Sequence, residues 1–358
     1  MEYLLLIVGL AILVVSGDAL VDSSTGIARF FKLPTLIIGL TIVAFGTSAP
    51  ELFVSVMSGL NGHSSMAVGN VIGSNCINVS VIVGITALIC PFVVSKQSIT
   101  VDTMFMLFLT LVLLDFGVWG NGISRFEGMC MFLMLLAFVV WSIKKAKAEV
   151  AAQPQPETEK ADDEEKKEKP LWLNCVILVA SIAGLAVGAH LMVGAASNIA
   201  RSFEVSERII AVTVVALGTS LPELTASVMG ALKGESDLTV GNIVGSNIFN
   251  IGSVLALSST TTPINFVEPA ALAAMGAAAA NEFTTTAQFT NDMLWMFAFE
   301  VMLLIGMINV TNNFSLFKKT GEVRNLFSAE DGLVGRIWGA CALAMYAYYV
   351  YLLLNKAV

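Results

Sequence analysis

Two closely similar stretches decide the fold: GTSAPELFVS at residues 46–55 and GTSLPELTAS at residues 218–227. Each lies inside a long apolar run, and each places a proline and a glutamate at its middle. A carboxylate at the centre of a membrane-spanning helix costs roughly 2.5–3.5 kcal/mol on insertion scales. The sequence therefore predicts that other residues compensate for Glu51 and Glu223.

The composition of the chain is that of a membrane protein. Of its 358 residues 56% are hydrophobic and 13% are charged, and the mean hydropathy is +0.81. The charges gather between apolar runs, and a helix of about 20 apolar residues crosses a hydrocarbon core of roughly 30 Å. These runs predict an all-α polytopic membrane protein with ten spans, at about 2–28, 33–60, 66–90, 101–119, 126–144, 171–199, 207–232, 239–258, 293–311 and 332–354.

The N-terminal run lacks the features of a cleaved secretory signal and reads as the first span. The five cysteines lie in or beside apolar runs, are odd in number and lack metal-type spacing. This pattern favours small packing residues over a disulfide framework.

Residues 145–170 separate two halves of five spans, 1–144 and 171–358. This segment is rich in charge, proline and glutamate, which is typical of a solvated linker. Placing it in the cytoplasm puts 15 of the 19 Lys and Arg residues on the cytoplasmic side, as the positive-inside rule requires. We therefore expect a multi-pass protein of the cell (inner or plasma) membrane, with both termini outside.

The two halves contain a repeat. With a shift of 172, residues 41–80 and 213–252 share 22 identities in 40 positions, and the repeats extend over about 37–91 and 209–263. Beyond them the similar helix starts at Asp102 and Asp292 differ by 190, so the second half holds about 18 extra residues within 264–292. Because the first half has an odd number of spans, five, the second half enters the membrane from the opposite side. Two inverted halves are typical of alternating-access transporters.

The recurring polar residues predict an oxygen-lined pocket. Proline has no N–H and clashes with the preceding turn, so Pro50 and Pro222 are expected to break each helix before its glutamate and to free carbonyls around 44–47 and 216–219. Unwound backbone at membrane depth is tolerated where it lines a cavity or is buried. The side chains that recur with this break are Thr47, Ser48, Glu51, Ser74 and Asn78, and then Thr219, Ser220, Glu223, Ser246 and Asn250.

The ligand set consists of hard oxygen donors, which suits calcium, sodium or, less well, magnesium. Two carboxylates carry −2, which one Ca²⁺ or two Na⁺ would neutralise, and a third Na⁺ would make exchange electrogenic. The expected partners are these ions and the lipid bilayer, with no cofactor, no nucleic acid and no obligatory protein partner.

The paired motifs AFGTSAPE…GNVIGSNCIN and ALGTSLPE…GNIVGSNIFN resemble the alpha-repeats of the sodium/calcium exchanger family, within the cation/calcium antiporter superfamily. The resemblance implies that Glu51 and Glu223 hold calcium with the carbonyls of Thr47 and Thr219. It also implies three sodium ions per calcium and gating by sliding of the first and sixth spans. The implied sodium ligands are Ser48, Ser74, Ser220, Ser246 and the carbonyls of Ala44 and Ala216, with Asn78 and Asn250 facing the centre.

Several alternatives bear on function. Potassium-coupled relatives carry an acid at the position of Asn250, so the resemblance predicts a potassium-independent exchanger.

A proton/calcium antiporter is the alternative, because carboxylates also carry protons. A channel is disfavoured by the internal inverted pair, and a hydrolase by the absence of HExxH and GxSxG motifs, so no enzyme is expected. For Glu300 we favour a helix-pairing or interface position. For His190 we favour a polar contact near the membrane interface over a pH switch. Asp18 and Asp22 are expected either to line an ion pathway or to cap a helix end.

Overall fold

The computed structural model describes residues 1–61, 64–92, 94, 98–119, 122–152, 169–203, 216–266, 285–308 and 335–356. Within these ranges the chain is mostly helical. Seven helices are long and apolar enough to cross a membrane, and an eighth span is formed if the bent pair Thr35–Thr47 and Ala49–Leu60 is counted as one. The structure therefore agrees with a polytopic helical membrane protein.

The first half contains α1 (Glu2–Phe31), α2 (Thr35–Ile38), the π-helix η1 (Gly39–Val43), α3 (Ala44–Thr47) and α4 (Ala49–Leu60). It continues with α5 (Ser64–Ile77), the π-helix η2 (Asn78–Ile82), α6 (Val83–Ile89), the π-helix η3 (Ser98–Asp102), α7 (Thr103–Trp119), β1 (Gly122–Ile123) and α8 (Arg125–Ala152). The helix α8 runs past residue 144, where the linker was expected to begin. Its extension is rich in Lys, Ala and Glu, which favour helix, and Lys145 pairs with Glu149 one turn on at 3.7 Å.

The second half contains α9 (Leu171–Ser202), α11 (Ala216–Thr219), α12 (Leu221–Leu232), α13 (Ser236–Phe249), the π-helix η5 (Asn250–Leu255) and α14 (Ala256–Thr261). It ends with β2 (Ile264–Asn265), α16 (Thr286–Ile308) and α17 (Arg336–Lys356). Most of the linker, the start of the expected seventh span and most of the 264–292 insertion lie outside the described residues.

The two motif-bearing spans form the centre of the molecule. In the most apolar 18-residue stretch of each span, 78% of the residues are buried in Met66–Ile89 and 89% in Ser236–Thr261, against 28% for α1, α8 and α9. Lipid tails are as apolar as a leucine side chain, so the hydrophobic effect does not drive helices together inside a membrane. Contact between helices there depends on close packing. A Cβ on Gly245 would lie 2.7 Å from the Leu40 carbonyl, so the two halves meet there backbone to backbone.

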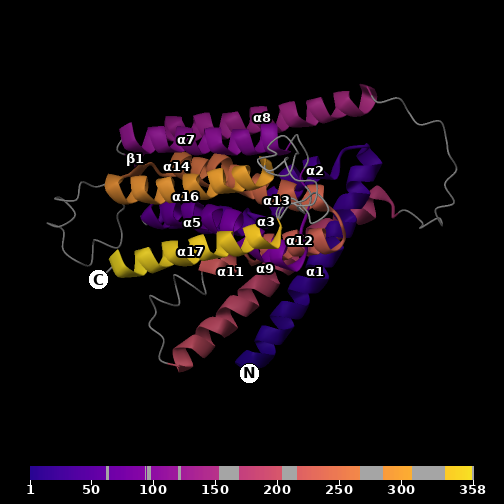
Figure 1. The fold of residues 1–358 in the computed structure, drawn as a ribbon, viewed down its shortest axis with the longest axis horizontal. Coiled ribbons are helices and arrows are strands. Elements are labelled where there is room, and N and C mark those ends of the chain that lie inside the picture. Colours follow the sequence, from indigo (N-terminus) through magenta and orange to yellow (C-terminus); the bar gives the residue numbers. More distant parts are fainter. Residues whose placement is uncertain are drawn as a thin grey trace, which may run out of the picture.

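Figure 1 shows α7, α8, α16 and α17 running across the view, with α1 and α9 crossing obliquely below them. The helices α1 and α9 pack against each other and approach closely where Gly9 meets Gly188. A smaller hydrophobic core joins this pair to α12, and a larger core surrounds α5, α7, α13 and α16. At one end the halves are also joined by β1 and β2, which pair antiparallel with Gly122 opposite Asn265.

Candidate ion-binding site

Each glutamate lies in the first turn of a helix that begins after a sharp break. Ser48 (φ −84°, ψ 6°) separates α3 from α4, and Ser220 (φ −92°, ψ 7°) precedes α12 in the same way. The first pair of helices bends by 44° at this point. The N-terminus of a helix carries a partial positive charge, which favours a carboxylate. The break before each glutamate is confirmed.

The backbone around the break differs from the expectation in one respect. Residues Ala44–Thr47 form a helical turn, and the Ala44 carbonyl accepts hydrogen bonds from the Ser48 N–H (3.0 Å) and the Thr47 hydroxyl (3.3 Å). It is therefore not freed by an unwound stretch. Because proline has no N–H, the carbonyl that loses its helical donor is the one four residues earlier, at Gly46 or Gly218.

The two glutamates come from different halves and lie in one buried region. Each is 1% exposed, and their charges interact with each other. The Ser48 hydroxyl donates to Glu223 Oε1 at 3.2 Å, so a side chain of the first motif contacts the carboxylate of the second. The structure thus brings the two motifs together.

An asparagine positions each glutamate from the following helix. Asn70 Nδ2 donates to Ser55 Oγ (2.9 Å) and to the Glu51 carbonyl (3.4 Å). Asn242 Nδ2 makes the same two bonds in the second half, to Ser227 Oγ (3.0 Å) and the Glu223 carbonyl (3.2 Å). These bonds hold the backbone carbonyl of each glutamate against the following helix.

A second group of asparagines joins the two halves. Asn75 and Asn247 exchange bonds from Nδ2 to each other's carbonyl, at 3.3 and 3.4 Å. Asn78 Nδ2 donates to Asn247 Oδ1 and Asn250 Nδ2 donates to Asn75 Oδ1, both at 3.0 Å. Asn78 and Asn250 each begin a π-helix, η2 or η5. Single π-helical turns are frequent at functional sites.

Six of the expected ligands carry buried oxygens that have no hydrogen-bond partner. Leaving such an atom unpaired costs about 1–3 kcal/mol, and native proteins do so rarely. A bound cation satisfies an oxygen that finds no donor. The atoms are both carboxylate oxygens of Glu51, Glu223 Oε2, Oδ1 of Asn78 and Asn250, and Oγ of Ser220 and Ser246.

The remaining expected ligands other than Ser48 lie on α3, α5 and α11. Ala44, Thr47 and Ser74 are buried, and Thr219 is half-buried. The residue Ala216 begins α11. Among the described residues no three His, Cys, Asp or Glu side chains group together as a metal cluster. The site therefore combines two acids with neutral oxygens.

Sequence reasoning did not identify the contact between α1 and the end of α12. Lys233 Nζ lies 2.8 Å from Asp18 Oδ1 and 2.6 Å from Asp22 Oδ1, and also donates to the Asp18 carbonyl. Partial burial lowers the pKa of Lys233, but the bonds and negative charges of these aspartates outweigh it and raise that pKa above its ordinary value. The signal available in the sequence was the spacing of four residues between Asp18 and Asp22, which puts two carboxylates on one helix face where a positively charged side chain can bind both.

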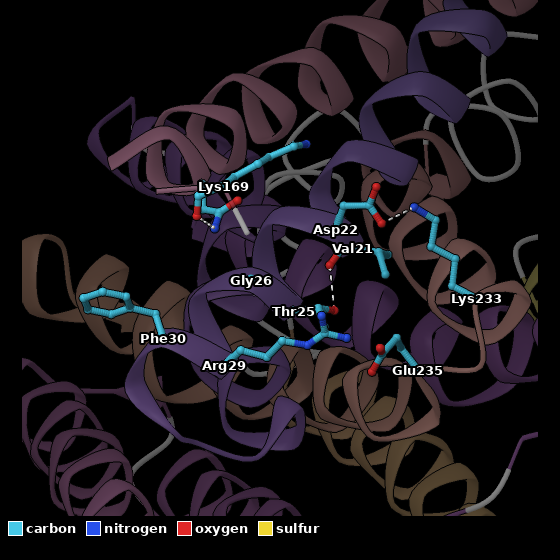
Figure 2. Close-up of a pocket in the computed structure, with 10 residues that line it drawn as sticks. Val21, Asp22, Thr25, Gly26, Arg29, Phe30, Lys169, Lys233 and Glu235 are labelled. Carbon is cyan, nitrogen blue, oxygen red and sulfur yellow. Dashed lines mark hydrogen bonds and ion pairs between the residues drawn. The ribbon is translucent and has the colours of Figure 1, made fainter. Parts of the chain in front are cut away.

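A cavity of about 630 Å³ opens beside this contact. Figure 2 shows Asp22 and Lys233 pointing toward each other on one side of it, with Arg29 and Glu235 on the lower side. Lys169, just before α9, also lines the cavity. The cavity therefore lies at the end of the molecule where the linker joins the second half. The site glutamates do not line this cavity.

The other residues singled out by the sequence are not among the expected ligands. His190 is exposed on α9, whereas His63 lies outside the described residues. All five cysteines are free, and Cys175 and Cys341 are exposed rather than packed inside. Glu300 is fully buried on α16 and accepts a hydrogen bond from Thr110 of α7 at 3.0 Å, which agrees with a helix-pairing role.

Comparisons with known proteins give one consistent result. The family model described as "Sodium/calcium exchanger protein" matches residues 1–144 and 173–355. The putative antiporter CaxA of Alkalimonas amylolytica is 39% identical over 72% of this chain and 80% of its own length. The inner membrane protein YrbG of Escherichia coli is 38% identical over 72% of this chain and 79% of its own. A structure of the sodium-calcium exchanger NCX_Mj has a similar fold, with a TM-score of 0.74, 24% identity and 98% coverage of both chains.

Proposed function

Because the chain belongs to the sodium/calcium exchanger family, a family of cation/calcium antiporters and not of enzymes, we propose that it exchanges sodium for calcium by alternating access. In this proposal its ten spans form two inverted five-helix halves, residues 1–144 and 171–358, joined by the linker 145–170. The observation that carries the proposal is the set of buried, unpartnered oxygens contributed by both halves. Such a set suits a dehydrated hard cation.

Each class of ligand has a role in the proposal. Glu51 and Glu223 bind calcium, because only they supply the charge that a divalent ion needs, and the carbonyls of Thr47 and Thr219 complete their coordination. Sodium ions use neutral oxygens beside the same carboxylates. The sodium ligands are Ser48, Ser74, Ser220, Ser246 and the carbonyls of Ala44 and Ala216, with Asn78 and Asn250 at the centre.

Charge balance determines the electrical behaviour. The two carboxylates carry −2, so one Ca²⁺ neutralises them and three Na⁺ leave one positive charge in excess. Exchange of three Na⁺ for one Ca²⁺ is therefore electrogenic in this proposal. Potassium is not required, because Asn250 supplies an amide where a further monovalent cation would need an acid.

The proposed location is the cell membrane. Relatives are named as membrane proteins, and the described helices are long and apolar enough to span a bilayer. We place the linker in the cytoplasm and both termini outside, because this arrangement puts most Lys and Arg residues on the cytoplasmic side.

Uptake of radioactive calcium into proteoliposomes tests the proposal. Sodium-loaded vesicles diluted into sodium-free, potassium-free buffer are expected to accumulate calcium. Uptake should be faster when the vesicle interior is positive, because three Na⁺ leave for each Ca²⁺ that enters and one net positive charge moves outward. Equal uptake driven by a proton gradient without sodium would instead establish the proton/calcium alternative. Uptake that appears only with potassium would contradict potassium independence.

Charge-neutralising variants test the site itself. Glu51→Gln and Glu223→Gln are each expected to reduce sodium-driven uptake by at least a hundredfold, since one carboxylate cannot balance a divalent ion. Glu149→Gln, at an exposed position on α8, is the matched control and is expected to behave as the wild type. Near-normal uptake by either site variant would contradict the assignment.

A further inference from the structure

Glu300 is a third acid in the membrane core and has no role in the proposed exchange. It is fully buried in the middle of α16, with the buried side chains of Met296 and Leu303 about one turn to either side. Its hydrogen-bond partner, Thr110, is flanked in the same way on α7 by Met106 and Leu113. All four apolar residues belong to the larger hydrophobic core, so the carboxyl lies in surroundings poor in oxygen.

The position of Glu300 follows from the repeat. In this part of the chain the halves are related by a shift of 190, the difference between Asp292 and Asp102. The same shift relates Glu300 to Thr110, since 300 − 190 = 110. Thr110 Oγ1 donates to Glu300 Oε1 at 3.0 Å, so two equivalent positions touch each other. Equivalent positions meet only near the pseudo-two-fold axis, where Asn75 and Asn247 also meet.

The carboxyl of Glu300 needs a positive partner. Its Oε2 atom is buried without a hydrogen bond, and none of the described Lys, Arg or His side chains forms an ion pair with it. An isolated carboxylate in such surroundings is strongly disfavoured and is retained only with a proton or a cation. Metal cations require several oxygen ligands, and calcium takes six to eight. One hydroxyl and one free carboxyl oxygen suit a proton.

We propose that Glu300 is a proton-binding site on the pseudo-two-fold axis, separate from the ion pocket, with the proton on Oε2 and the Thr110 hydroxyl bonded to Oε1. While the proton is bound, Glu300 adds no charge to those of Glu51 and Glu223. When hydroxide removes it as water, the O–H bond at Oε2 breaks and a third negative charge remains near α5 and η2, which pack against α16. Loss of the proton therefore stops exchange at alkaline pH, a consequence that rests on the proposed function.

Other titratable groups lie on the elements packed against α16 or on α16 itself. Among the described residues, Thr110 is the side chain that hydrogen-bonds the carboxyl. The groups are Cys76 on α5, Asp102 and Asp115 on η3 and α7, Asp292 on α16, and Arg336, Cys341, Tyr346, Tyr348, Tyr349, Tyr351 and Lys356 on α17. A variant of Glu300 is needed to separate its proton from theirs.

Infrared spectroscopy of the reconstituted protein detects the proton directly. At neutral pH and saturating calcium, which keeps Glu51 and Glu223 ionised, the wild type is expected to show the carbonyl band of a protonated acid, shifted in D₂O. Glu300→Gln is expected to lose this band. Thr110→Val is expected to keep it at a changed frequency, because the bond to Oε1 is gone. An unchanged band in Glu300→Gln, or a wild-type band abolished by sodium or potassium, would overturn the proposal.

Calcium uptake against pH tests the consequence. Wild-type uptake is expected to fall at least tenfold at alkaline pH, while Glu300→Gln, which stays neutral, keeps its rate. Parallel profiles would contradict the role of the Glu300 proton in exchange. Absence of sodium-driven uptake in the wild type would contradict the proposed function and leave the infrared result standing. If Glu300→Gln does not fold, an unchanged band frequency in Thr110→Val contradicts the site.

Discussion

At the scale of single residues, the two glutamates have equivalent supports but unequal hydrogen bonds. Asn70 and Asn242 hold the two glutamate carbonyls in the same way. Ser48 bonds to Glu223, whereas its counterpart Ser220 has an unpartnered hydroxyl. The two halves of the pocket therefore offer a cation different free oxygens. This difference allows the two sub-sites to bind different cations.

The asparagine at position 250 is expected to control which cations the pocket accepts. Its Nδ2 donates to Asn75 Oδ1, so Asn250→Asp places an oxygen against an oxygen unless the new acid is protonated. We expect the variant to fold, to transport near the wild-type rate at acid pH, and to lose activity relative to the wild type as pH rises. Sodium-driven calcium uptake at several pH values measures this.

The equivalent substitution in the first half is the matched control. Asn78 donates to Asn247 Oδ1 at the same distance, so Asn78→Asp is expected to show the same relative loss. A loss confined to one of the two variants would contradict the equivalent roles assigned to these asparagines.

At the scale of elements, the site depends on two helices that approach more closely than side chains allow. Gly245 of α13 faces the Leu40 carbonyl and the Ala44 side chain, so a Cβ there would lie 2.7 Å from the carbonyl oxygen and 2.8 Å from the Ala44 Cβ. The contact therefore fixes the position of Ala44, one of the expected sodium ligands, relative to the helix that carries Ser246.

Gly245→Ala is expected to destabilise the protein by about 1–3 kcal/mol, the usual cost of overpacking. Thermal unfolding in detergent should show a lower midpoint, and sodium-driven uptake should fall with it. Gly194→Ala on α9 is the control, because a Cβ there meets no atom within 4 Å and the residue is exposed. Equal midpoints for the two variants would contradict the close packing of α13 against η1 and α3.

The ion pair between α12 and α1 is expected to influence movement rather than binding. Lys233 holds both Asp18 and Asp22, and α1 is the first span, whose sliding is implied by the resemblance to the exchanger family. Lys233→Met is expected to change the maximal rate of exchange several-fold while the calcium concentration for half-maximal uptake stays constant. Lys145→Met removes a comparable ion pair within α8 and is expected to change neither. A changed half-maximal concentration in Lys233→Met would contradict this role.

At the scale of the whole molecule, the sequence predicted the parts that depend on local pattern and missed those that depend on contacts between the halves. Glu51 and Glu223 could be identified because a proline and an acid inside an apolar run have few explanations in a membrane. The bond from Ser48 to Glu223 joins residues 175 apart in the sequence, and the bond from Thr110 to Glu300 joins residues 190 apart. The periodicity of apolar residues does not predict contacts between residues so far apart in the sequence. The shift of the repeat does show that Thr110 and Glu300 are equivalent positions.

The inverted arrangement of the halves makes a prediction for two equivalent residues. Asn61 follows α4 and Lys233 follows α12, and a shift of 172 relates them. If the second half enters the membrane from the opposite side, these two positions lie on opposite faces. With all five native cysteines replaced, we expect Asn61→Cys to react with a membrane-impermeant maleimide in intact cells.

Lys233→Cys is expected to react only after the membrane is permeabilised, which also serves as the control that both cysteines are accessible. This result does not depend on transport, so it remains readable if the loss of the ion pair to α1 slows exchange. Labelling of both positions from the same side would mean that the halves are parallel. If that shared side is the outside, Lys233 and the cavity that it lines do not lie on the cytoplasmic side.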